Sequence, residues 1–240
     1  MFLMTRSPKP LSPQPPRRPR QSPSHAGTAG ADAPRQPTAA RLRKIRTILE
    51  AAERNFAQLG FEGASLEVIA QDVGISRHSL LYYFPSKEAL YREVLDDVLT
   101  QWLQGMSDLL RGDDPAAALR TYIAAKLASS RDRPSGAKVF AKEIMAGAPY
   151  FADAIRQRVA PALRDDVAAF ARWADEGKIA RVDFTHLLFI LWSVTQAYAE
   201  QQAQFALLLG KRALDAQDFG QAEALLSHMV LATLQPAPRA

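Results

Sequence analysis

Residues 65–91 read SLEVIAQDVGISRHSLLYYFPSKEALY, and this stretch decides the fold. Apolar residues recur at helical spacing on both sides of Gly74, which predicts two short helices, from Ser65 to Asp72 and from Ser76 to Tyr83, joined by a tight turn. Each predicted helix begins at a serine, a residue type that caps helix N-termini. Two short helices joined by a glycine-containing turn are typical of a helix-turn-helix unit.

The second of these helices presents polar side chains on its outer face. They combine charged phosphate donors, hydroxyls and groups that can reach base edges. We therefore expect this face to enter the major groove of DNA, as the second helix of a helix-turn-helix does. The alternative is an ordinary helical corner with a solvated face. The outward set consists of Arg77, His78, Ser79, Tyr82 and Tyr83.

Helical periodicity continues in both directions from this unit. Upstream, an apolar stripe runs from residue 41 to residue 59 and ends at Gly60, a residue suited to a left-handed helix end. Downstream, Pro85 and Ser86 break the chain and start a long fourth helix. Farther on, Pro161 predicts a kink or a break in the helix between residues 150 and 176. Because no stretch alternates with a period of two, we predict an all-α protein without a sheet.

Charge and composition suggest three parts. Residues 1–40 are rich in Pro, Arg, Ser and Ala and hold six basic residues against one acidic residue. This composition predicts a disordered arm, which either adds sequence-independent attraction to DNA or is dispensable. The rest of the chain holds 24 basic and 24 acidic residues. Within it, residues 41–92 are mildly cationic and are the expected DNA-binding domain, and residues 93–236 are the expected ligand-binding and dimerisation domain.

The composition also excludes several classes of protein. There is no cysteine and the four histidines are scattered, so we expect no metal site and no cofactor, and a reducing cytoplasm suits the chain. No apolar run approaches the roughly 20 residues that span a bilayer, and the apolar start is too short for a signal peptide. The only enzyme-like motif is Ser135-x-x-Lys138, which lacks its companion motifs. We therefore expect a protein that is not an enzyme.

The run from Arg46 to Trp102 resembles the N-terminal domain of the TetR family of repressors. The resemblance implies an all-α homodimer in which each subunit has a three-helix DNA-reading head and a C-terminal domain for a small-molecule effector. It also implies a palindromic operator, from which the effector releases the protein. The motifs that carry the resemblance are Gly60-Phe61-Glu62-Gly63-Ala64-Ser65, Val73-Gly74-Ile75-Ser76 and Tyr82-Tyr83-Phe84-Pro85-Ser86-Lys87-Glu88-Ala89-Leu90-Tyr91.

The resemblance assigns roles to individual residues of this sequence. Ser65 would cap the second helix against a phosphate, and Lys87 would meet a phosphate at the start of the fourth helix, where free N–H groups also favour an anion. The sequence departs from the family at Leu81, where most members have tyrosine, and at Tyr83, where most have histidine. The details of base reading are therefore expected to differ. Ser76, Arg77, His78 and Ser79 would face the major groove, and Tyr82 and Tyr83 the DNA backbone.

Besides residues 80–91, the chain contains the segments Ser130-Arg131-Asp132, Met145-Ala146-Gly147-Ala148-Pro149, Gly177-Lys178 and Thr195-Gln196-Ala197-Tyr198-Ala199. Together they carry a closer resemblance, to the family members that regulate pyrimidine utilisation, which extends through Ala199 and implies a pyrimidine effector. Trp192 and Gln196 are four residues apart and share a helix face. An indole stacks on a flat heterocycle, and a primary amide matches the N–H and carbonyl edge of uracil or thymine. The alternative places Trp192 in the core and Gln196 at a subunit interface. Lys126 and Glu143 are weaker candidates for the pocket, since charged helical residues are usually solvated.

Two further questions stay open. The divergence after Ala199 allows a hydrophobic effector, and the basic arm allows a ligand-independent architectural DNA binder. The dimer is expected from the last two helices, about 184–209 and 220–234, unless their apolar stripes only close the core of one subunit. The stripes consist of Leu187, Leu188, Leu191, Leu225 and Met229.

Overall fold

A computed structural model describes residues 38–109 and 113–236, with the side chains of residues 106–109 left out. The predicted arm, residues 1–40, lies outside the described residues except for its last three positions. The all-α prediction is confirmed, since the described ranges contain helices and no strand. The elements are α1 (Ala39–Gly63), α2 (Leu66–Asp72), α3 (Arg77–Tyr83), α4 (Lys87–Leu109), α5 (Pro115–Asp132), α6 (Pro134–Met145), α7 (Ala152–Ala154), the π-helical turn η1 (Ile155–Val159), α8 (Ala160–Asp175), α9 (Phe184–Glu200), α10 (Gln202–Leu208) and α11 (Ala216–Thr233).

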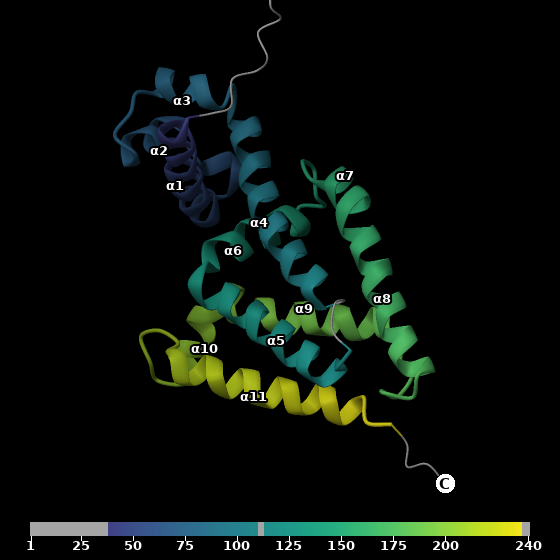
Figure 1. Cartoon of the computed structure of the whole chain (residues 1–240). Coiled ribbons are helices and arrows are strands. Elements are labelled where there is room, and N and C mark those ends of the chain that lie inside the picture. Colours follow the sequence, from purple (N-terminus) through teal and green to yellow (C-terminus); the bar gives the residue numbers. More distant parts are fainter. Residues whose placement is uncertain (1–37, 110–112, 237–240) are drawn as a thin grey trace, which may run out of the picture. The chain divides into compact units, whose positions relative to one another are not determined.

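The first three helices gather around the N-terminal end of α4 (Figure 1). They share a core whose members include Phe56 of α1, Ile69 of α2 and Leu80 of α3, each fully buried. The same core includes Val139 of α6. The reading head, which consists of α1, α2 and α3, therefore shares its core with a helix from the C-terminal part of the chain. Burial of Leu80 fixes α3 against its neighbours and leaves the opposite face of this short helix outward.

Two glycines shape this head. Gly74 has a φ of 65° and makes the turn between α2 and α3, as its place in the sequence predicts. Gly60 has a φ of 72°, also as predicted, but the helix resumes after it and α1 ends only at Gly63. The expected stop at Gly60 is therefore an interruption within α1.

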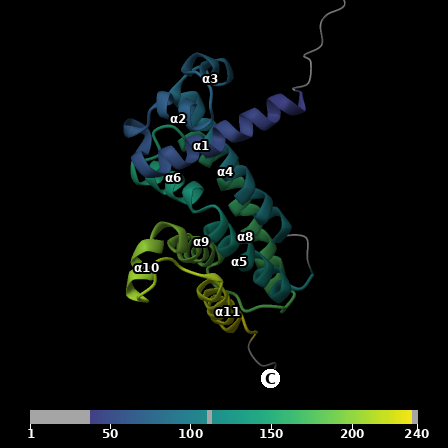
Figure 2. The same ribbon diagram turned by 90° about the vertical axis from the view of Figure 1, so that its left-hand side faces the viewer.

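A second core lies between α5, α8, α9 and α11. Its fully buried members include Ile123 of α5, Phe170 of α8 and Leu188 of α9. In both views α4 leads from the reading head toward this group of helices (Figure 1, Figure 2). Leu103 of α4 packs against both cores. The described residues belong to one compact unit, and the predicted boundary between residues 92 and 93 falls inside α4, so it stays a prediction.

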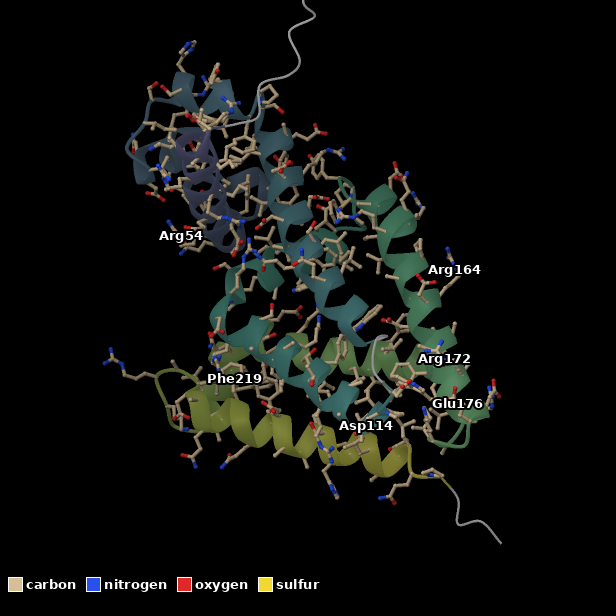
Figure 3. The ribbon with its side chains drawn as sticks, in the orientation of Figure 1. Arg54, Asp114, Arg164, Arg172, Glu176 and Phe219 are labelled. Atoms are coloured by element: carbon tan, nitrogen blue, oxygen red, sulfur yellow. The ribbon has the colours of Figure 1, made fainter. Side chains whose placement is uncertain are left out.

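The ends of the C-terminal helices follow local capping rules. Asp114 stands at the N-terminus of α5 (Figure 3), where its carboxylate accepts from the backbone N–H groups of Ala116 and Ala117 at 2.9 and 3.2 Å. Pro161 lies in the first turn of α8, directly after the π-helical turn, and this confirms the interruption expected at that proline. None of the described helices is both long and apolar enough to cross a membrane.

Candidate DNA-binding face and effector cavity

The outer face of α3 is exposed at the positions that the sequence singles out. Arg77, His78 and Ser79 are exposed, and Tyr82 is 72% exposed. Ser76 stands at the N-cap, where its hydroxyl accepts from the backbone N–H of Ser79 at 3.0 Å. The cap and the buried Leu80 together hold a polar surface in a fixed orientation.

Ser65 occupies the N-cap position of α2, as predicted, but its hydroxyl makes no capping hydrogen bond to the backbone of that helix. Its hydroxyl instead donates to Oε2 of Glu67 at 2.9 Å. The carboxylate of Glu67 accepts from its own backbone N–H and from Ser65, and these bonds lower its pKa. Glu67 also pairs with Nε of Arg77 at 2.8 Å, so α2 steadies a side chain of α3.

The two tyrosines at the end of α3 are held by a cation from another helix. Their rings meet edge to face at 5.5 Å, and the guanidinium of Arg41 in α1 lies 5.2 Å from the Tyr82 ring and 5.1 Å from the Tyr83 ring. Tyr83 is only partly exposed. The sequence pattern did not single out Arg41, because the contact depends on how α1 crosses α3.

Lys87 lies at the start of α4, as expected, but its ammonium group is engaged within the protein. Nζ donates to the carbonyl oxygens of Glu62 and Ala64, both at 3.3 Å, and lies 4.6 Å from the centre of the Phe61 ring. It therefore ties the first turn of α4 to the connection between α1 and α2. A phosphate contact by Lys87 stays a prediction.

A cavity of about 410 Å³ lies between α4, α5, α6 and α9, with part of η1 in its wall. It brings together three of the four predicted effector residues: Trp192, Gln196 and Lys126. The fourth, Glu143, is absent from this lining. Glu143 is 2% exposed and accepts from the backbone N–H of Tyr150 at 2.7 Å, so its role in the structure is to hold the segment after α6.

The wall of the cavity also contains residues that sequence reasoning missed. Glu200 follows Gln196 by one helical turn, a spacing that would have identified it. Trp102 comes from α4, more than twenty positions from Lys126, and no local pattern links them. The rest of the lining is mainly apolar and comprises Leu99, Leu103, Phe140, Ala141, Ile144, Met145, Ile155 and Val159.

Two polar side chains of the cavity are held in place. The indole Nε1 of Trp192 donates to the hydroxyl of Tyr122 in α5 at 2.6 Å, which fixes the orientation of the ring. Nζ of Lys126 lies 4.4 Å from the centre of the Trp102 ring. Burial lowers the pKa of Lys126 to about 8, and the charge of Glu200 opposes that shift. The cavity thus holds a cation in largely apolar surroundings.

A partly buried ion cluster joins the reading head to the helices around the cavity. Arg133, between α5 and α6, donates from Nε to Glu53 of α1 at 2.7 Å and from Nη2 to Asp97 of α4 at 2.7 Å. Arg46 of α1 also pairs with Asp97, at 3.1 Å. Arg133 further lines a smaller hollow of about 230 Å³, which it shares with Lys126. No local sequence pattern predicts this cluster, because its members are far apart along the chain.

Comparison with known proteins decides the family. Residues 48–94 match the family described as bacterial regulatory proteins, tetR family, and residues 95–237 match the family described as YcdC-like protein, C-terminal region. The HTH-type transcriptional regulator RutR of Escherichia coli K12 is 37% identical over 193 residues, which cover 80% of this chain and 91% of that protein. The chain belongs to the TetR family. It is therefore a helix-turn-helix DNA-binding transcriptional regulator, and this family consists of regulators rather than enzymes.

Solved structures agree with this assignment at the level of the fold. The putative transcriptional regulator SCO4942 from Streptomyces coelicolor aligns with a TM-score of 0.60 at 21% identity, over 81% of this chain and 98% of that one. AibR, solved with isovaleryl coenzyme A and operator DNA, aligns with a TM-score of 0.61 at 18% identity, over 78% of this chain and 98% of that one. The TetR-type fold is thus shared with regulators of little sequence similarity.

Proposed function

We propose that this TetR-family regulator represses transcription as a homodimer on a palindromic operator, and that a small molecule in the α4–α9 cavity releases it. The observation that carries the proposal is the path of α4. This helix begins at Lys87, directly after α3, and its residues Leu99, Trp102 and Leu103 line the cavity. An occupant of the cavity therefore touches the same helix that supports the DNA-reading face.

On DNA, the exposed face of α3 would enter the major groove and the two tyrosines would lie along the backbone. The cap and the ion pair with Glu67 favour this role because they restrict the motion of the face before binding. A phosphate contact by Lys87 would require its ammonium to give up two bonds of 3.3 Å. Ser65 would reach a phosphate through the hydroxyl that now meets Glu67. Chromosomal DNA as target implies action in the cytoplasm.

The dimer would form through exposed apolar side chains of the last helices. Leu225 and Met229 of α11 are 61% and 56% exposed, and Ile190 of α9 is 58% exposed. Leu225 also lines a groove of about 400 Å³ with residues of α9 and α10. In contrast, Leu187, Leu188 and Leu191 of the predicted stripe are buried within the subunit, which corrects that part of the expectation. They close the core because α9 turns that face toward α5.

For the effector, we propose a pyrimidine such as uracil or thymine. Trp192 and Gln196 line one cavity, so a ring stacked on the indole lies within reach of an amide that pairs with its N–H and carbonyl edge. The volume of the cavity falls within the usual range for small-molecule sites. A second candidate is a more hydrophobic effector, which the mainly apolar lining favours.

Release would follow from a shift of population. The effector must bind better to a conformation whose two α3 helices no longer match major grooves about 34 Å apart. A coupling of about 1–3 kcal/mol between the two ligands is typical of such proteins. Since α4 both lines the cavity and supports α3, a small change in its tilt at the cavity would move the DNA-reading face.

The proposal is tested with the full chain and a binding site selected from random duplexes. We expect a palindromic site, and we expect uracil or thymine to weaken binding in fluorescence anisotropy. The same pyrimidines should raise the melting temperature of the wild-type protein but not that of Gln196→Ala, with exposed Gln217→Ala as control. Equal shifts in all three proteins would remove the site assignment. Shifts caused only by apolar compounds would favour the second candidate, and a site without symmetry would contradict the dimeric repressor.

A further inference from the structure

Lys126 is an unusual residue for the wall of a mainly apolar cavity. Its side chain comes from the middle of α5 and the residue is only 9% exposed. Among the described residues its Nζ has no hydrogen bond and no ion pair, and it lies over the face of Trp102, 4.4 Å from the ring centre. A buried ammonium that has lost water and gained no anion is costly to a fold. Such a group suits a site whose ligand brings the missing charge.

The other charges near Lys126 form no ion pair with it. Glu200 of α9 lines the same cavity and acts on the cation over a distance, but it is exposed and forms no ion pair with Lys126. Solvent screens such an exposed carboxylate. Arg133 and Asp132 border the smaller hollow beside Lys126, but Arg133 is already paired with Glu53 and Asp97, and Asp132 is paired with Arg131. The end of the cavity at Lys126 therefore carries a positive charge that has no paired anion among the described residues.

We propose that the effector carries a carboxylate that pairs with Lys126, next to an amide or imide edge that Gln196 binds. The inference rests on the proposed effector site and names the chemical class of its ligand. A neutral ring would displace water from the cavity and leave the ammonium without an anion. A carboxylate would instead form a charge-assisted hydrogen bond with it in surroundings of low polarity. The ligand class is thus a small acid with an amide group, such as a carboxylated or ring-opened pyrimidine.

The arrangement of the side chains supports a ligand with two different ends. Gln196 and Trp192 lie on α9, whereas Lys126 lies on α5 and Trp102 on α4. The Trp192 ring is held by Tyr122, which belongs to the same helix as Lys126. A ligand that spans from the amide to the ammonium would therefore bridge α5 and α9 and touch α4. This places the charged anchor beside the helix that leads to the DNA-reading face.

The test uses pairs of probes that differ in charge. Orotate is uracil with a carboxylate, and benzoate and benzamide are a matched pair without a pyrimidine ring. Thermal shift and calorimetric titration are carried out on the full wild-type chain and on Lys126→Met, which removes the charge and keeps the length of the side chain. Lys142→Met, an exposed position on α6, is the matched control. Far-ultraviolet circular dichroism verifies that all three proteins are folded.

We expect orotate to bind the wild type and Lys142→Met at least tenfold more tightly than uracil, and Lys126→Met to lose that preference. Likewise, benzoate should bind more tightly than benzamide only to the proteins that retain Lys126. Equal binding of orotate by the wild type and Lys126→Met overturns the inference, as does binding of uracil without any binding of orotate. In that last case the pyrimidine effector stands and only the acid is wrong. If benzoate binds in a way that depends on Lys126 and neither pyrimidine binds, the anion site at Lys126 is supported and the pyrimidine effector is contradicted.

Discussion

Nε of Arg133 donates to Oε2 of Glu53 at 2.7 Å, and this bond joins the junction of α5 and α6 to the middle of α1 across 80 positions of sequence. The Glu53 side chain is 6% exposed and that of Arg133 is 22% exposed. The same guanidinium pairs with Asp97 of α4. The DNA-reading head and the helices around the cavity are therefore connected by charge as well as by the length of α4.

Glu53→Gln should destabilise the protein by about 3 kcal/mol, at the low end for a broken buried pair, because Asp97 still compensates Arg133 in part. Urea unfolding followed by circular dichroism measures the change. Arg46→Gln is the control, since its pair with Asp97 is on an exposed rim and should matter by less than about 1 kcal/mol. If both variants lost the same free energy of unfolding, burial of the Glu53–Arg133 pair would not increase its contribution to stability.

Arg77→Ala should weaken operator binding by about tenfold or more while leaving the melting temperature almost unchanged, because the side chain is 57% exposed and its pair with Glu67 contributes little to folding. Anisotropy titrations with the selected duplex measure the affinity. Arg164→Ala provides the control, since Arg164 is exposed on α8 (Figure 3) and this helix is not part of the reading face. An unchanged affinity in Arg77→Ala would contradict the placement of α3 in the groove.

Asp166 should make the folded state less stable as the pH rises. The residue is 1% exposed, neither carboxylate oxygen has a hydrogen-bond partner among the described residues, and burial, followed by the charge of Asp165, raises its pKa from 3.8 to about 7. The folded state thus holds the proton more tightly than the unfolded state. Its contribution to stability is complete below about pH 4 and is lost as the pH rises through about 7.

The size of this effect is on the order of a few kcal/mol between pH 5 and pH 8. Urea titrations at several pH values should show a smaller decline for Asp166→Asn than for the wild type, and a more stable variant at pH 8. Asp165→Asn, at an exposed neighbour, should retain most of the wild-type slope. Parallel curves for the wild type and Asp166→Asn would show that this carboxyl does not titrate in that range.

Leu225→Asp should convert the proposed dimer into monomers, because it places a charge in the middle of the exposed apolar face of α11. Size-exclusion chromatography with light scattering measures the mass. The control is Leu59→Asp, a leucine of α1 that is 54% exposed and belongs to the reading head. A wild-type protein that elutes as a monomer at micromolar concentration, or a Leu225→Asp variant that stays dimeric, would exclude this face as the interface.

The sequence predicts the reading head well because its signals are local. Gly74 and the serine before α3 lie within a few residues of the helices that they shape, and Leu80 falls on the only apolar side of a seven-residue helix. The interruption of α1 at Gly60 follows from the same kind of local signal, a glycine at the end of an apolar stripe. What the pattern missed there is the short continuation to Gly63, where the chain after a left-handed residue returns to helical hydrogen bonding.

The cavity is only partly predictable, because tertiary contacts decide it. Trp192 and Gln196 share a face by helical spacing, but nothing local shows that Lys126 lies across from them or that Glu143 turns away to hold Tyr150. Likewise, the apolar residues of α9 read as one broad stripe. Only the positions of the helices packed against α9 distinguish the buried Leu188 from the exposed Ile190 two residues later.

The two tryptophans in the cavity wall give the protein an optical signal of its own. The chain has three tryptophans, and two of them, Trp102 and Trp192, stand in the cavity wall, while Trp173 is sealed in the C-terminal core. An aromatic occupant stacked on an indole quenches its emission, and Trp173 supplies a constant background. Filling of the cavity can therefore be followed by intrinsic fluorescence, without a label and in the presence of DNA.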